Sequence, residues 1–412
     1  MNERLDFLRK KLNIYAPRIR TRYKQYDMKY QDANLSVVIP KEVSHRYRSV
    51  MGWCSKAVDA LADRLVFRDL EFDFLDMMSI FNMNNPDVLF DNAILSALIA
   101  SCSFIYISKN ERDEVRLQVI EANNATGSID PITGMLKDGY AVLERDKEGH
   151  AVLEAYFEPY RTIIITTVNN KEHYQEYKHS APYPLLVPII HRPDAVRPFG
   201  RSRITRSAEY WQALAKRTLE RAEVTSEFYS FPQKYVLGMS SDAESFDTWK
   251  ATIASLLRID QDEEGKIPSV GQFQTSSMSP FIDQLRMAAS GFAGETGLTL
   301  DDLGFVSDNP SSAEAIKASH ETLGVMARKA QRSFGTSILN VGYLASCLRD
   351  DYPYLRSEVY RTKVKWEPVF VPDASTLSLI GDGTIKINQA LDGYITKDVL
   401  HDLTGIKGGN DE

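Results

Sequence analysis

Two groups of neighbouring carboxylates are the side chains of this sequence whose types and spacing could do chemistry. Asp301 and Asp302 are adjacent, and Asp260, Asp262 and Glu263 occupy a second short stretch. Carboxylate oxygens are the ligands that Mg²⁺ prefers, so either group could hold a metal ion for phosphoryl chemistry. Adjacent carboxylates on a loop are more often solvated charge, however, and we expect neither a metal ion nor a cofactor in this chain.

Other motifs typical of catalytic sites are missing from the sequence. The seven histidines and three cysteines show no HxH, HExxH or CxxC spacing, so the pattern does not predict a zinc site. The close glycines of segment 291–297 follow a predicted helix and lack the lysine of a phosphate-binding loop. No Gly-x-Ser-x-Gly elbow is present. The sequence therefore favours a structural or binding role.

Length and composition indicate a folded protein of two or three subdomains. The 412 residues are 43% hydrophobic and 25% charged, which is ordinary for a folded domain and argues against disorder. Cys54, Cys102 and Cys347 are widely spaced and odd in number, so we expect buried thiols in a reducing compartment. No apolar run approaches the roughly 20 residues of a membrane span, so no membrane partner is expected.

The first fifty residues carry a basic arm. Its cations are Arg9, Lys10, Lys11, Arg18, Arg20, Arg22 and Lys24. Such an arm could contact nucleic acid, or it could be the solvated face of a helix, and the sequence favours neither alternative.

Residues 1 to about 200 have the periodicity of a mixed helical and β unit. Apolar spacing predicts helices over 44–65 and from Pro86 to Ile99. A β-branched and aromatic run predicts a strand over 104–107, and an apolar period of two then predicts further short strands. These further strands are 115–120, 140–143, 150–157, 161–167 and 172–177.

Five prolines between Pro182 and Pro198 exclude a continuous helix or a central strand and predict a boundary. Helices are predicted beyond it over 202–229, 245–257, 280–292 and 311–348, with strands over 234–238 and 362–366. Ser311 and Glu314 have the spacing of a capping box, and Gly335 suggests a bend in the long helix. Three short helices, 375–380, 385–391 and 396–403, are expected to end the chain.

The tract 298–310 separates two of these helices and directly follows Gly297. A glycine-bearing start, a tract without helical periodicity and a capped restart are typical of a mobile loop on a rigid frame.

The order of these blocks carries a family resemblance. The proline-rich segment closes at Phe199-Gly200-Arg201-Ser202, and Phe231-Pro232, Val270-Gly271-Gln272-Phe273 and Thr296-Gly297-Leu298 follow in turn. The most specific block is Asn309-Pro310-Ser311-Ser312-Ala313-Glu314-Ala315. Across most of its length the chain resembles the portal proteins of tailed bacteriophages, in the Gp6-like group.

The resemblance implies an α+β portal fold with a mixed α/β wing, a two-helix stem, a small α/β clip and a long kinked helix behind a tunnel loop. A short helical crown completes it. The implied parts are an N-terminal arm and wing (1–201), stem helix 1 (202–229), clip (230–277), stem helix 2 (278–296), tunnel loop (297–310), long wing helix (311–348), wing return (349–377) and crown (378–412).

The same resemblance implies a structural role. Portal proteins form rings, usually of twelve subunits, at one capsid vertex, and double-stranded DNA passes non-specifically through the channel during packaging and ejection. The implied partners are other copies of the chain, the large terminase subunit, a head-completion adaptor, and the major capsid and scaffolding proteins. The implied location is the virion, after assembly in the host cytoplasm.

The resemblance also assigns roles to particular residues. The channel-lining residues of the tunnel loop would be Leu298, Leu300, Asp301, Asp302, Leu303, Phe305 and Val306. Docking of terminase or adaptor on the clip would use Asp260, Asp262, Glu263, Glu264 and Lys266. Possible channel cations on stem helix 1 are Lys216, Arg217 and Arg221, although ion pairing with nearby glutamates is the alternative. The apolar loop residues could press on the duplex or pack between neighbouring subunits.

Net charge agrees with a DNA conduit. Twelve copies at −7 would carry roughly −84, and an electronegative channel with few fixed cations lets phosphates slide where a basic groove would hold them. Two rival interpretations stay open: a metal-dependent DNA-processing enzyme using Asp301 and Asp302, and a ring-forming scaffold that passes no DNA.

Overall fold

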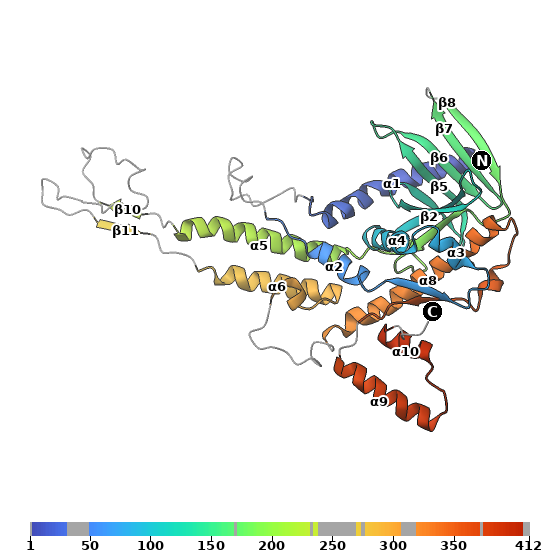
Figure 1. Ribbon diagram of the computed structural model, residues 1–412. Coiled ribbons are helices and arrows are strands. Elements are labelled where there is room, and N and C mark those ends of the chain that lie inside the picture. Colours follow the sequence, from blue (N-terminus) through green and yellow to red (C-terminus); the bar gives the residue numbers. More distant parts are fainter. Residues whose placement is uncertain are drawn as a thin grey trace.

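The computed structural model describes residues 2–30, 49–168, 171–230, 234–237, 269–272, 277–305, 319–370 and 374–406. Figure 1 shows an elongated molecule, with a body of helices and sheets at one end from which two long helices extend side by side toward a small β-ribbon. Every strand pair in the described residues is antiparallel. The α+β class predicted from the sequence is confirmed.

Two antiparallel sheets and a ribbon form the β part of the body. A five-stranded sheet has the order β4 (Ala125–Ile129), β5 (Leu136–Arg145), β6 (Ala151–Glu158), β7 (Arg161–Val168), β8 (Lys171–Lys178). A three-stranded sheet has the order β3 (Val115–Glu121), β2 (Cys102–Lys109), β9 (Leu186–Ile190). The ribbon pairs β1 (Phe67–Glu71) with β12 (Lys363–Trp366). All the strands predicted between residues 104 and 177 are present, and β1, β4 and β9 were not predicted.

The proline-rich segment contributes strand β9 to the body. Pro188 lies opposite Phe104 of β2, and within the described residues β9 pairs with no other strand. A proline is tolerated there because an edge strand does not need every backbone N–H for the ladder. The sequence rule against a central strand therefore holds, but it hid an edge strand whose five residues are all buried.

The basic arm is part of helix α1 (Asn2–Tyr26), which packs on the five-stranded sheet. Its apolar side and the sheet form a separate core of Leu5, Leu8, Leu12, Tyr140, Val142, Tyr156, Ile163 and Ile165. The guanidinium of Arg9 pairs with buried Glu154, Lys11 donates to the carbonyl of Gly127 (2.6 Å), and Arg22 donates to Ala100 O. These three cations hold the helix to the body, so neither alternative considered from the sequence describes them.

The main core surrounds helix α8 (Glu321–Arg349). Helices α2 (Trp53–Ala62), α3 (Met77–Asn82) and α4 (Pro86–Ala100) contribute to it, together with β2 and β9. The three cysteines are buried and free, as expected. The helix predicted over 44–65 is shorter, since it begins at Trp53, and residues 44–48 lie outside the described residues, as do 311–318 of the predicted long helix.

The C-terminal region differs from the prediction at one helix. A 3₁₀ turn, Arg356–Val359, leads to β12, and the two short helices predicted after it are one helix, α9 (Ala374–Ala390). Gly381 and Gly383 did not break this helix, because propensity is a weak prior. None of the α9 side chains from Thr376 to Ala390 is buried, and the final helix α10 (Lys397–Thr404) is capped by Thr396, at the predicted position.

Helices α5 (Arg206–Ser230) and α6 (Ser279–Thr296) form the extended part of the molecule, with the ribbon β10 (Lys234–Leu237) and β11 (Ser269–Gln272) beyond them (Figure 1). The helix predicted from Ser202 begins four residues later because Ser202 and Arg203 bond to α4: Arg203 N donates to Leu98 O (2.8 Å) and the Ser202 hydroxyl to Ile99 O (2.5 Å). The predicted helix 245–257 lies outside the described residues.

The two long helices approach closely at a glycine. A Cβ placed on Gly291 of α6 would lie 2.4–2.6 Å from ring atoms of Trp211 in α5, which no real contact permits without displacement. Ala215 of α5 and Ala288 and Ala289 of α6 are also fully buried, in the main core. The indole of Trp211 therefore rests directly on the α6 backbone.

We expect Gly291→Ala to lower the free energy of unfolding by about 1–3 kcal/mol, because the added methyl overpacks the contact with Trp211. Gly294→Ala is the matched control in the same helix: no atom lies within 4 Å of its would-be Cβ, so the better helix propensity of alanine should stabilise by up to about 1 kcal/mol. Urea unfolding of both variants checks this pair. Equal effects of the two substitutions would contradict the close approach.

Candidate functional site

The loop that follows α6 begins with an ordered turn. Helix α6 ends at Gly297, whose φ of 69° is left-handed and whose N–H donates to Ala293 O (2.8 Å). A short 3₁₀ helix, Asp301–Leu303, follows, and Gly304 (φ 88°) closes it with an N–H donated to Asp301 O (3.0 Å). The described part of this loop, residues 297–305, is therefore a compact turn.

The apolar residues of the loop face the protein's own body. Leu298 is 6% exposed, and Leu300, Leu303 and Phe305 are half-buried against the main core. The sequence had left open whether these side chains would press on a duplex or pack between subunits; in a single subunit they fasten the loop to its own core. Val306 lies outside the described residues.

The two adjacent carboxylates of the loop have different environments. Asp302 Oδ2 accepts hydrogen bonds from the Thr299 N–H (2.9 Å) and hydroxyl (3.0 Å), and His320 Nδ1 lies 3.8 Å from it. Asp301 is exposed. Among the described residues, the three metal-ligating side chains that come together are Asp146, Glu148 and His150, on an exposed hairpin, and the loop pair belongs to no such group. Asp302 thus stabilises the turn by accepting hydrogen bonds from Thr299.

Lys216 and Arg221, two of the three cations expected on the stem, have different surroundings. Lys216 is partly buried, and its ammonium donates to the carbonyl of Tyr30 (3.2 Å), while its own carbonyl accepts from the Ser49 hydroxyl (3.0 Å). Arg221, further along α5, is exposed. The acidic residues expected on the clip, 260–266, lie outside the described residues.

A residue that the sequence did not single out lies where the loop leaves α6. Arg203 is 4% exposed; its Nε donates to Ala57 O (3.2 Å), its Nη2 to Thr296 O, and its Nη1 lies 3.2 Å from Met326 Sδ. Burial lowers the pKa of the Arg203 guanidinium to about 10, with a further contribution from the positive charge of Arg192. The guanidinium stays protonated at neutral pH.

A tight turn delivers Arg203 to this position. Arg201 N donates to His191 O (2.9 Å), and His191 Nδ1 donates in return to Arg201 O (2.7 Å), since a carbonyl can only accept. Gly200 has a φ of 72°, and a Cβ there would lie 2.1 Å from His191 O, so no other residue fits. The Phe-Gly-Arg-Ser block noted in the sequence is the signal that marks this turn.

His191 is the buried side of that turn. It is 2% exposed, and its ring stacks on Phe334 of α8 with centroids 6.2 Å apart. Burial lowers its pKa to about 3, and the neighbouring cations Arg203 and Arg192 act in the same direction. His191 is therefore neutral in the folded protein at every pH near neutrality.

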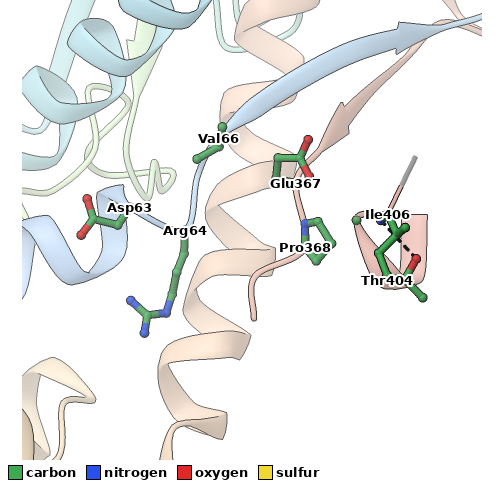
Figure 2. Close-up of a pocket in the computed structure, with 8 residues that line it drawn as sticks. Asp63, Arg64, Val66, Glu367, Pro368, Thr404 and Ile406 are labelled. Carbon is green, nitrogen blue, oxygen red and sulfur yellow. Dashed lines mark hydrogen bonds between the residues drawn. The ribbon is translucent and has the colours of Figure 1, made fainter. Parts of the chain in front are cut away.

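One pocket of about 330 Å³ lies where α10 meets the β1–β12 ribbon (Figure 2). Its lining residues are Asp63, Arg64, Val66, Glu367, Pro368, Thr404, Gly405 and Ile406. Beside it, Asp402 of α10 pairs with Arg68 and Lys365 of the ribbon. These ion pairs hold α10 to the β1–β12 ribbon, and the pocket is the gap that remains between these two elements.

Comparison with known proteins decides the family. The model of the family described as "Phage portal protein, SPP1 Gp6-like" matches residues 5–377. The chain belongs to this portal family. The resemblance stated from the sequence is thereby confirmed, and the matched range ends just before the segment 378–412 that was expected to form a crown. Portal proteins of this family are structural subunits of phage head-to-tail connectors.

Individual relatives agree with the family. The "Portal protein" of Mycobacterium phage L5 is 27% identical over 402 residues, covering 90% of this chain and 79% of that protein. The "Portal protein" of Mycobacterium phage D29 is 31% identical over 158 residues, 36% of this chain and 32% of that one.

Solved structures were also compared. A chain from the neck of a native gene transfer agent particle, computed with C12 symmetry, has 13% identity and a TM-score of 0.44, with 94% of this chain and 99% of that chain covered. A chain from the neck of an empty particle, computed with C6 symmetry, has 13% identity and a TM-score of 0.43, with 89% and 93% covered. In the described residues, no helix is both long and apolar enough to cross a membrane.

The buried histidine predicts how stability depends on pH. An unfolded histidine titrates near 6.5, so between pH 6.5 and about 3 the unfolded state binds more protons than the folded portal subunit. The free energy of unfolding should fall as the pH falls through this window, with His191 contributing about 1.4 kcal/mol per pH unit.

His191→Asn keeps an N–H donor for Arg201 O and cannot titrate, so its unfolding free energy should decline less steeply below pH 6.5 than that of the wild type. Urea unfolding at pH 7.5, 6.0 and 5.0 measures both slopes. Identical slopes would show that His191 does not resist protonation.

Proposed function

We propose that this chain is the subunit of a ring, usually of twelve copies, whose axial channel conducts double-stranded DNA during packaging and ejection at one capsid vertex. The observation that carries the proposal is the family match over residues 5–377, which includes both long helices α5 and α6 and the loop at their base. In this proposal α5 and α6 are the stem, residues 297–310 the tunnel loop, and the body the wing. The wing would contact capsid and scaffolding proteins.

The charge of the chain supports a channel that releases DNA. A subunit carries −7, and twelve would carry about −84, so phosphates meet net repulsion and slide. Of the three stem cations, we assign channel contact to Arg221, which is exposed, with Arg217 as a half-buried neighbour. The ammonium of Lys216 is directed to the Tyr30 carbonyl, so a role in the channel would require that contact to break.

The loop would present its polar tip to the duplex. Asp301 and Gly304 are exposed, whereas Leu298, Leu300, Leu303 and Phe305 pack against the body. An acidic, glycine-bearing tip above an apolar base suits non-specific contact with a moving polyanion. We propose the same channel-lining role for Asp302 and Val306, and docking of the large terminase subunit or head-completion adaptor at Asp260, Asp262, Glu263, Glu264 and Lys266 of the clip.

Electron microscopy of the purified full chain, with mass measurement in parallel, tests the proposal. We expect a ring of about twelve subunits with an axial channel wide enough for a duplex, roughly 20 Å. Particles assembled without the chain should contain no packaged genome.

Two results would contradict this function. Filled particles assembled in its absence would favour a ring or scaffold that passes no DNA. Mg²⁺-dependent DNA cleavage by the wild type that disappears in Asp301→Ala would instead favour the metal-dependent rival; Asp302→Ala is a poorer probe because Asp302 also holds the turn.

A further inference from the structure

One buried cation joins four helices at the base of the tunnel loop. The backbone N–H of Arg203 binds α4 through Leu98 O (2.8 Å), and its guanidinium contacts the Ala57 carbonyl of α2 (3.2 Å), the Thr296 carbonyl of α6 and Met326 Sδ of α8 (3.2 Å). Thr296 is the last residue of α6 and is itself 1% exposed. The loop starts at the next residue, so Arg203 holds the point from which it emerges.

The contact between Arg203 and the Thr296 carbonyl places a cation at the C-terminal end of α6. The last carbonyls of a helix lack partners within the helix and carry partial negative charge, and a cation placed there stabilises the end of the helix. Glu295 adds a formal negative charge nearby, and its carboxylate accepts a hydrogen bond from the Thr205 hydroxyl (2.7 Å). The segment just before α5 thus donates two hydrogen bonds to the end of α6, one from Arg203 and one from Thr205.

Helix α8 contacts the first residue of the loop, Gly297. A Cβ added to Gly297 would lie 3.1 Å from Thr322 Cγ2 and 3.3 Å from Met326 Cε, so the first loop residue already touches α8. Met326 also contacts the Arg203 guanidinium. A displacement of the loop base would therefore move side chains of both the stem and the long wing helix.

We propose that Arg203 is the positioning residue of the tunnel loop: it fixes the direction in which the loop leaves α6 and couples movement of the loop to α8 through Met326. The mechanical consequence of this anchor rests on the proposed function, whereas the anchor itself is a property of the folded subunit. Arg203 touches no DNA in this proposal and acts only through the loop.

The chain offers a matched control for a merely structural role. Arg22 is a partly buried arginine whose guanidinium donates to the Ala100 carbonyl at the end of α4, and burial lowers its pKa to about 10 as well. It differs from Arg203 in the helix end that it binds. If burial alone explained Arg203, the two arginines would be interchangeable in any test of the loop.

Hydrogen exchange of the full chain, read by mass spectrometry, tests the anchor. The reporters are the amides of Leu303 and Phe305, which donate to Leu300 O, and of Gly304, which donates to Asp301 O. We expect Arg203→Met to raise exchange at these amides about tenfold or more, and Arg22→Met to leave them within about twofold of the wild type. Arg203→Lys, which keeps one donor, should fall between.

Equal exchange of the loop in Arg203→Met and Arg22→Met, whether both unchanged or both raised, would overturn the proposal. Met326→Leu covers the case in which Arg203→Met fails to fold, because it conserves volume and removes only the sulfur contact. It should raise loop exchange more than the matched Met287→Leu in exposed α6 surface. No difference between these two methionine variants would likewise overturn the coupling to α8.

A particle assay separates this inference from the proposed function. If the loop positions DNA, particles built with Arg203→Lys should package or retain less DNA than those with Arg22→Lys. A loosened loop with unchanged DNA content would support the anchor and contradict the loop's DNA role. Failure of the wild type to form rings would contradict the proposed function, while the exchange comparison would still support or overturn the anchor.

Discussion

The arrangement of the two long helices, the loop and the body depends on one constraint: the buried guanidinium of Arg203 needs hydrogen-bond acceptors. Removing a charge from water is costly unless hydrogen bonds replace the lost hydration. The hydrogen-bond acceptors of the Arg203 guanidinium are backbone carbonyls of α2 and α6, which belong to separate segments of the chain. Satisfying this one group therefore fixes where α6 ends with respect to the body, and with it the start of the loop that follows α6.

The turn before Arg203 makes that constraint effective. A long side chain positions its partners only if its own backbone is fixed. The reciprocal bonds between His191 and Arg201, and the glycine at position 200, leave the segment little freedom, and the ring of His191 stacks on Phe334 of α8. The junction between β9 and α5 is thus rigid for reasons local to the sequence, although its effect is felt at the end of another helix.

The sequence predicted elements whose signals are local. A β-branched and aromatic run located β2, and period-two alternation located β3, β5, β6, β7 and β8. Pro86 located the start of α4, and the helix expected over 396–403 is α10, shifted by one residue. Prediction from the sequence failed where contacts between distant segments determine the secondary structure. Pro188 obscured an edge strand, and the two helices predicted over 375–380 and 385–391 are the single helix α9.

The site was predictable only in part for the same reason. The resemblance proposed a tunnel loop at 297–310, but it did not predict that the leucines of this loop would pack inward or that Asp302 would accept the hydrogen bonds of its turn. Arg203 looked like any other cation of a charged helix, because its three acceptors lie roughly 90 to 150 residues away. No periodicity reports a contact across that separation.

In the proposed function, the stem and the loop face opposite demands. A conduit for DNA must release phosphate, so few of its exposed groups can be cations such as Arg221. Such a surface cannot be stiffened by many exposed ion pairs with phosphate-binding cations. In this subunit the support comes from packing behind the surface: Trp211 rests on Gly291, leucines of the loop pack on the core, and the Arg203 cation is buried at the end of α6. A charge that would retard DNA if it were exposed in the proposed channel thus stabilises the base of the loop.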